Sequence, residues 1–130
     1  ALGAPYERQC RHTGERLAQR LGLADDQWTL TFQSRFGPAE WLQPYTAPTL
    51  VDLARRGVRS VDVVCPGFVA DCLETLEEIS IEARKSFLDA GGEAFAYVAA
   101  LNDSPPFIEA LASLVERNLL GWPTRLAPQA

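Results

Sequence analysis

Residues 61–79 read VDVVCPGFVADCLETLEEI and change in pattern from strand to helix. The first five residues are almost continuously apolar, as in a strand of a parallel sheet that is covered on both faces. A Pro-Gly turn at positions 66–67 then opens a long helical pattern, expected from about Val69 to Ala90. This stretch therefore predicts a strand–turn–helix unit, in which a ligand would bind at the carboxyl end of the strand.

The alternation of helix and strand continues on both sides of this unit. Further helices are predicted over residues 5–22, 48–56 and 106–120, and further strands over residues 28–32 and 94–101. Such an order favours an α/β fold in which a parallel sheet lies between two layers of helices, a three-layer αβα architecture. Three strands are few for such a sheet, so we expect one strand to be missing from this chain or to be supplied by a partner.

The size and charge of the chain limit its class. At 130 residues it is long enough for one domain with a hydrophobic core, expected over residues 1–121, followed by a loose tail over residues 122–130. Lys and Arg number 12 against 17 Asp and Glu, which gives a formal net charge of −5, and the basic residues are scattered. Binding to nucleic acid is therefore not expected.

Cysteine usage and hydropathy indicate the compartment. The odd number of cysteines, Cys10, Cys65 and Cys72, without close pairing argues against a disulfide scaffold. The lack of a Cys-x-x-Cys pair argues against a zinc site and an iron–sulfur cluster. No apolar run approaches the ~20 residues of a membrane span, and no signal-peptide pattern is visible. We expect a reducing, cytoplasmic location, with peripheral attachment to a membrane left open.

Three glutamates, Glu74, Glu78 and Glu82, recur every four residues along the predicted helix. This spacing stacks their carboxylates on one face, where like charges repel by about 0.2–0.5 kcal/mol per pair on an isolated helix. The plainer interpretation is a solvated acidic face. The functional alternative is a site for a divalent cation such as Fe(II), because carboxylate oxygens are suitable ligands. Neighbouring carboxylates would also raise one another's pKa and prepare one of them to take up protons.

A long irregular segment, residues 33–46, follows the strand predicted over residues 28–32. Connections of this length in a compact domain are often functional. The segment carries Trp41, which together with Phe68 would line an apolar pocket for a flat ligand. The alternative, that both rings simply anchor the segment to the core, stays open.

Four blocks of the sequence resemble, in order, the C-terminal half of the ferrochelatases, which complete protoheme synthesis. The blocks are TFQSRFG at 31–37, WLQPYT at 41–46, PGFVADCLETLEE at 66–78 and LNDSP at 101–105. The resemblance covers roughly residues 5–120 and is strongest to proteobacterial members. It implies a chelatase-like fold of two similar α/β domains facing each other across a porphyrin cleft, of which this chain would form one half.

The resemblance also implies an activity, the insertion of Fe(II) into protoporphyrin IX with release of the pyrrole protons. Glu74 takes the place of the family's catalytic glutamate and would also contact the metal. Glu78 and Glu82 match further acidic positions on a path for metal or protons, while Ser34, Trp41 and Phe68 match residues that line the porphyrin pocket. Fe(II) is then a substrate, and neither a tightly bound cofactor nor an iron–sulfur cluster is expected.

Two departures from the family pattern matter. The family's histidine motif, its N-terminal domain and the first strand of this domain do not occur in the chain, so we expect the chain alone to be inactive and the N-terminal domain of the same protein to be its partner. Cys72 stands where animal enzymes carry a histidine, as is usual among proteobacterial relatives. The open sheet edge would also permit pairing with a second copy.

Two other functions stay open at this point. One is a related chelatase that acts on another tetrapyrrole, such as coproporphyrin or sirohydrochlorin. The other is a flavodoxin-like binding module without enzyme activity, in which the acidic helix is merely solvated.

Overall fold

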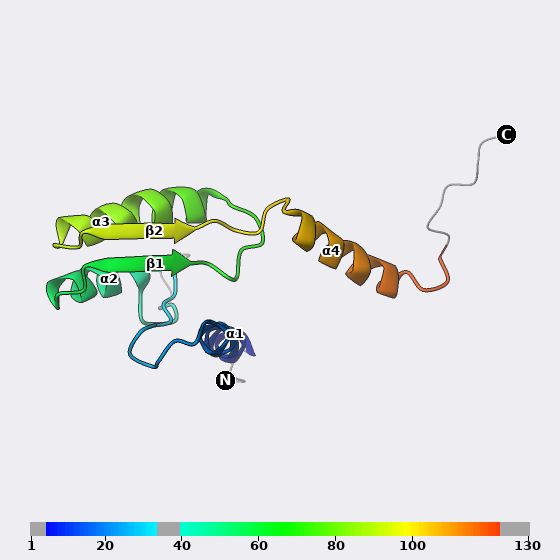
Figure 1. Ribbon diagram of the computed structural model, residues 1–130, viewed down its shortest axis with the longest axis horizontal. Coiled ribbons are helices and arrows are strands. Elements are labelled where there is room, and N and C mark those ends of the chain that lie inside the picture. The colour runs from blue at the N-terminus through cyan, green and yellow to red at the C-terminus, as the bar shows by residue number, and fades with distance from the viewer. Residues whose placement is uncertain (1–4, 34–39, 123–130) are drawn as a thin grey trace. The chain divides into compact units, whose positions relative to one another are not determined.

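The computed structural model describes residues 5–33 and 40–122, which divide into two units, residues 1–100 and residues 101–130. The elements, in chain order (Figure 1), are α1 (Pro5–Leu21), α2 (Thr46–Arg55), β1 (Ser60–Val64), η1 (Glu74–Ala83), α3 (Arg84–Asp89), β2 (Ala94–Val98) and α4 (Pro105–Asn118). The first unit contains every element except α4, and it carries the candidate site.

The sheet of the first unit consists of β1 and β2, which pair in parallel from Ser60 opposite Ala94 to Val64 opposite Val98. Exposed and half-buried residues alternate along both strands. The half-buried set faces the core, while the alternate set, which includes Val64 and Val98, is exposed. The helix that connects the two strands, η1 with α3, packs against β2, and α2 packs against η1 and α3. The predicted α/β class with parallel strands is confirmed.

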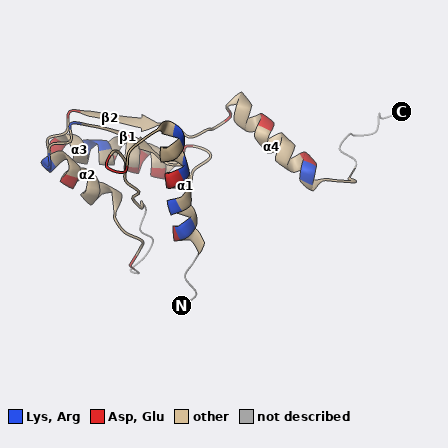
Figure 2. Ribbon diagram, turned by 60° about the horizontal axis from the view of Figure 1, so that its bottom comes forward, with Lys and Arg blue, Asp and Glu red and all other residues tan. Residues whose placement is uncertain are grey.

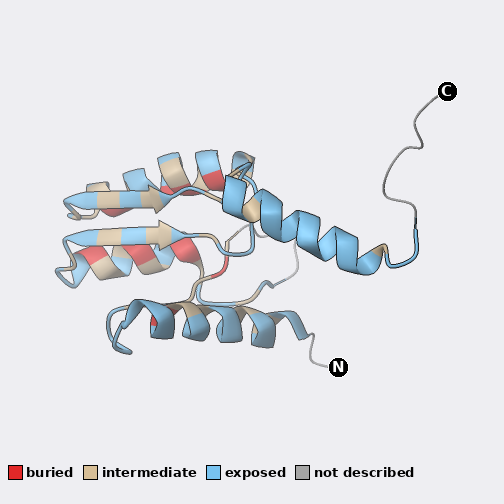
Figure 3. Cartoon of the chain, turned by 45° about the vertical axis from the view of Figure 1, so that its right-hand side comes forward, coloured by how far each residue is buried: buried red, intermediate tan, exposed pale blue. Residues whose placement is uncertain are grey.

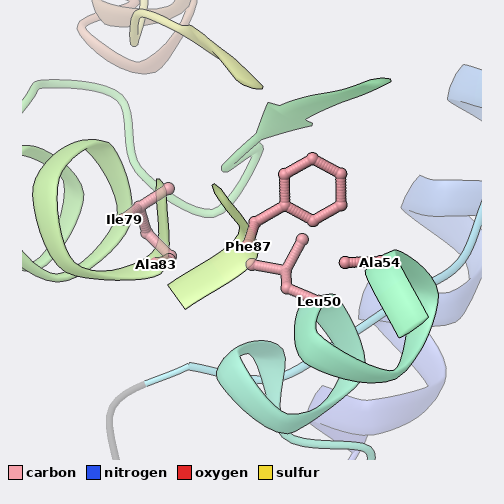
Figure 4. Close-up of a cluster of buried hydrophobic side chains, with 5 residues drawn as sticks. All are labelled: Leu50, Ala54, Ile79, Ala83 and Phe87. Carbon is pink, nitrogen blue, oxygen red and sulfur yellow. The ribbon is translucent and has the colours of Figure 1, made fainter. Parts of the chain in front are cut away.

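The hydrophobic core lies between these helices and the sheet. Its fully packed side chains come from α2 and from the continuous helix formed by η1 and α3 (Figures 3 and 4): Leu50, Ala54, Ile79, Ala83 and Phe87. Phe87 has no exposed surface, and its ring centroid lies 6.2 Å from that of Phe95 on β2. Burial of such an aromatic ring is a large favourable term for a unit of this size, so Phe87 fixes the helix against the sheet.

The prediction of a strand over residues 28–32 is wrong. Only Phe32 pairs, in an isolated parallel bridge with Tyr45. Its N–H donates to the carbonyl of Pro44 at 2.8 Å, and its carbonyl accepts from the N–H of Thr46 at 3.2 Å. A strand needs a hydrogen-bonded neighbour along its whole length, and among the described residues this segment finds one at a single residue. The described sheet therefore has two strands where three were expected.

The helix expected from about Val69 begins later, at Glu74, and its first ten residues are π-helical. The N–H of Arg84 donates to the carbonyl of Ile79, five residues back, which is the bonding pattern of a π-helix. Such segments are uncommon and occur frequently at functional sites. The end of the helix follows the prediction, because α3 stops at Asp89 and Gly91 adopts a φ of 108°, the left-handed conformation that closes many helices.

The remaining helices and strands lie within three residues of the predicted bounds. Acidic and basic residues are interspersed along α1 (Figure 2), where Arg11 pairs with Glu7 at 2.6 Å. In the second unit, α4 has no buried residue among those described. None of the described helices has both the length and the apolar character needed to cross a membrane. The boundary expected after residue 121 lies at the edge of the described range and stays a prediction.

Candidate active site at the carboxyl end of β1

The candidate site is built on residues 65–73, the segment that leaves the carboxyl end of β1 and leads into η1. The segment starts with a tight turn, in which the N–H of Phe68 donates to the carbonyl of Cys65 at 3.0 Å. In parallel sheets this edge is the place where ligands bind. The segment leads directly into η1. The local geometry therefore positions both Cys72, near the end of the segment, and Glu74, the first residue of η1.

One oxygen of the Asp71 carboxylate links this segment to neighbouring elements. Oδ1 of Asp71 accepts hydrogen bonds from the hydroxyl of Tyr97 at 2.6 Å, the hydroxyl of Thr75 at 3.0 Å and the N–H of Ala100 at 3.3 Å. Thr75 is fully buried, and its hydroxyl oxygen accepts the N–H of Cys72 at 3.0 Å. Each hydrogen bond to a charged group contributes about 1.5–3 kcal/mol, so the network firmly joins the end of β2 to the start of η1.

Two titratable groups near Asp71, the Tyr97 hydroxyl and the Cys65 thiol, have raised pKa values. Burial, and next the hydrogen bond to the Asp71 carboxylate, raise the pKa of Tyr97. Burial, and next the negative charge of Asp71, raise the pKa of the Cys65 thiol. Both groups therefore stay protonated at neutral pH, and the Tyr97 hydroxyl is a neutral donor to the Asp71 carboxylate.

Glu74, the predicted catalytic residue, is the first residue of η1 and is partly exposed. A hydrogen bond with the side chain of Cys72, followed by one with its own backbone N–H, lowers the pKa of Glu74. The expectation that neighbouring carboxylates raise a pKa in this row is therefore wrong for Glu74. The carboxylate is ionised at neutral pH, which suits it to contact a cation or to accept a proton transiently rather than to store one.

The other two predicted metal residues continue along η1. Glu78 is half-buried, and its Oε2 accepts from Nε2 of Gln33 at 2.6 Å, whereas Glu82 is exposed. The wide turn of a π-helix still returns residues four apart to nearly the same side. Within the described ranges no three His, Cys, Asp or Glu side chains are grouped closely enough to hold a metal ion. The carboxylates of Glu74, Glu78 and Glu82 thus lie in succession rather than as one chelating group.

The predicted pocket residues keep exposed aromatic surface. Trp41 is 40% exposed and Phe68 is 36% exposed. The ring of Trp41 lies at 44° to that of Tyr6 on α1, with 6.3 Å between the centroids, a geometry typical of paired aromatic rings. Ser34, the third predicted pocket residue, lies outside the described residues. Trp41 and Phe68 therefore keep exposed aromatic surface, and their role in a pocket stays a prediction. Tyr6 is a neighbour of Trp41 that the sequence did not indicate.

Sequence reasoning missed the residues that position the site, namely Gln33, Asp71, Thr75 and Tyr97. Asp71 and Thr75 are four residues apart at the start of a helix, a spacing at which side chains meet. Tyr97 occupies a core-facing position of an alternating strand, where a phenol hydroxyl needs a hydrogen-bond partner. These two patterns were visible in the sequence. The bond from Gln33 to Glu78 joins distant segments and had no local pattern.

Known proteins with similar sequences identify the family of this chain. The profile of the Ferrochelatase family matches residues 1–119. A ferrochelatase of Bordetella pertussis (strain Tohama I) is 65% identical over 123 residues, which cover 95% of this chain and 34% of the relative. A ferrochelatase of Herminiimonas arsenicoxydans is 59% identical over 127 residues, covering 98% of this chain and 34% of the relative. A ferrochelatase of Dechloromonas aromatica (strain RCB) is 58% identical over 126 residues, covering 97% and 34%.

The chain thus spans about a third of the length of the curated relatives it matches. Every described residue of the candidate site, from Gln33 to Tyr97, falls within the matched range of the family. The resemblance noted in the sequence is confirmed, and the chain belongs to the ferrochelatase family.

Proposed function

We propose that this chain forms the C-terminal part of a ferrochelatase that inserts Fe(II) into protoporphyrin IX, with Glu74 as the catalytic residue. The observation that supports this most directly is the position of Glu74, which is ionised, partly exposed and placed by the β1–η1 segment at the carboxyl end of the sheet. A family match that includes this residue adds to the support.

The chemistry of metal insertion requires what these side chains offer. The porphyrin ring must distort so that its pyrrole lone pairs point at the metal, and a base must receive the pyrrole protons. In this proposal Trp41, Phe68 and Ser34 grip the ring, and Glu74 contacts the incoming iron or accepts a departing proton. Weak oxygen ligation suits delivery, because a tight site would not release its iron. Glu78 and Glu82 extend the acidic path along η1.

The proposal includes the rest of the polypeptide. Because the chain matches about a third of its relatives' length, the opposite wall of the porphyrin cleft would come from the N-terminal domain of the same protein. Fe(II) is a substrate in this scheme, and the Cys10, Cys65 and Cys72 thiols serve no iron–sulfur cluster. The location proposed is the cytoplasm.

The test is the substitution Glu74→Gln in the full-length enzyme. A lost proton acceptor or metal contact should lower kcat for iron insertion by about 10²–10⁴-fold, and Glu77→Gln, at an exposed neighbouring carboxylate, should leave kcat within about twofold. Equal effects of the two substitutions would refute the role of Glu74. Turnover of coproporphyrin in preference to protoporphyrin IX, measured on the same protein, would contradict the substrate assigned here.

A further inference from the structure

We propose that Tyr97 is a positioning residue for the reaction, because its hydroxyl acts through Asp71 to hold the segment that presents Cys72 and Glu74. The inference rests on the proposed function of Glu74. Tyr97 itself lies on β2 and contacts neither iron nor porphyrin in this scheme, so its effect must pass through the hydrogen-bond network.

The first step is the link between β2 and the segment. Tyr97 stands on the core-facing side of β2, opposite Val63 of β1 in the parallel register. Its hydroxyl lies 2.6 Å from Oδ1 of Asp71, twenty-six residues earlier in the chain. Tyr97 is half-buried, and hydrogen bonds between a hydroxyl and a carboxylate are short and strong.

The second step leads from Asp71 to the catalytic side chain. The same oxygen accepts the hydroxyl of Thr75, which directly follows Glu74 in the chain, and the Thr75 oxygen in turn accepts the N–H of Cys72. Asp71, Cys72, Glu74 and Thr75 thus form one short loop of covalent and hydrogen bonds. A movement of the Asp71 carboxylate therefore also moves Thr75 and Cys72, which lie on either side of Glu74 in the chain.

The third step is the consequence for Glu74. Glu74 lies between Cys72 and Thr75 in the chain, and the network holds the backbone N–H of Cys72 on one side of it and the hydroxyl of Thr75 on the other. Removing the Tyr97 hydroxyl leaves Asp71 with weaker partners on that oxygen, and the alignment of Cys72 with Glu74 then loosens. The Glu74 carboxylate is then held less firmly, and kcat falls while binding of the porphyrin changes little.

The experiment compares Tyr97→Phe with the matched control Tyr45→Phe in the full-length enzyme. The hydroxyl of Tyr45 makes no hydrogen bond to any residue that the structure describes, so its removal should change little. Tyr97→Phe should lower kcat about 5- to 100-fold, the range expected when a catalytic group is slightly misplaced. The KM for protoporphyrin IX should change less than twofold, because Trp41 and Phe68 lie outside the network.

A second readout does not depend on turnover. Alkylation by iodoacetamide, followed at each cysteine by mass spectrometry, should become several-fold faster at Cys72 in Tyr97→Phe and stay unchanged at Cys10, which lies on α1. General destabilisation would accelerate all three cysteines alike and would overturn the proposal. Unchanged alkylation at Cys72 would overturn it as well.

The two readouts separate this inference from the proposed function. If the unsubstituted enzyme inserts no iron, the proposed function fails, and the alkylation at Cys72 still decides whether Tyr97 holds the segment. If the enzyme is active and Tyr97→Phe leaves kcat unchanged, the positioning role of Tyr97 is refuted while the role of Glu74 stands.

Discussion

At the scale of single residues, Cys72 determines how readily Glu74 binds a proton. Its side-chain hydrogen bond is the largest cause of the lowered pKa of Glu74, since hydrogen bonds to the charged form favour that form. We predict that Cys72→Ala raises the pKa of Glu74 toward the ordinary glutamate value. The measurement is a ¹³C NMR titration of the glutamate carboxyl carbons, with Cys10→Ala as the control, and an unchanged Glu74 titration in Cys72→Ala would contradict the prediction.

The lowered pKa of Glu74 also determines the direction in which the stability of the fold changes with pH. The pKa of Glu74 is lower in the folded chain than in the unfolded chain, where it is about 4.3. Its ionisation therefore stabilises the fold fully above the unfolded value, and that contribution is lost as the pH falls through the folded pKa. Cys72→Ala should make the unfolding midpoint less sensitive to acid over this window, and a greater sensitivity would contradict the argument.

Thr75 is the buried hydroxyl at the centre of the segment. We predict that Thr75→Val lowers the free energy of unfolding by about 1–3 kcal/mol, because Asp71 loses a donor and the N–H of Cys72 loses its acceptor in a buried place. The matched control is Thr49→Val, whose hydroxyl bonds to the carbonyl of Tyr45 within one helical turn. That carbonyl also accepts the N–H of Thr49, so the control should cost less than half as much in urea unfolding.

The site could be predicted from the sequence only where its residues share a local pattern. The spacing of Glu74, Glu78 and Glu82 indicated an acidic row, and the structure shows them in succession along η1. The pKa of Glu74 could not be predicted from that spacing, because it depends on a thiol two residues away and on a turn that the pattern does not specify. Tyr97 lies 26 residues from Asp71, and one sequence does not indicate such distant pairs.

At the scale of elements, the end of α3 depends on close approach of a glycine to the core. A Cβ added at Gly92 would clash with the ring of Phe87, which has no exposed surface and no room to move. We predict that Gly92→Ala lowers the free energy of unfolding by about 1–3 kcal/mol, the usual cost of overpacking a core. The control is Gly67→Ala, where the added Cβ meets nothing within 4 Å, and equal costs in urea unfolding would refute this account of Gly92.

The elements that the sequence predicted well are those stabilised by their own residues. The helices α1, α2 and α4 follow from amphipathic spacing and from helix breakers. The segment over residues 28–32 has the composition of a strand, yet whether it becomes one depends on a neighbour that composition does not reveal. The π-helical bonding of η1 was equally invisible, because a row of residues four apart fits both kinds of helix.

At the scale of the whole molecule, the exposed outer face of the sheet is the feature that a partner would cover. Parallel sheets are almost always covered on both faces, but Val64 and Val98 on the outer face of β1 and β2 are 45% and 49% exposed. Self-association through the open sheet was expected from the sequence and stays a prediction. The proposed function gives another reason why the sheet is incomplete, because the chain matches only about a third of the length of each relative.

We therefore predict that the 130-residue chain alone inserts no measurable Fe(II) into protoporphyrin IX, and that co-expression with the remainder of the Bordetella pertussis relative restores turnover. The reason is geometric: a porphyrin gripped from one side is neither distorted nor shielded from water, and Glu74 then has no substrate held against it. The same co-expression with the chain carrying Glu74→Gln should not restore turnover, which separates catalysis from mere assembly. Robust turnover by the chain alone would show that the second wall is unnecessary, and an inactive but assembled complex would show that this chain does not supply the missing residues.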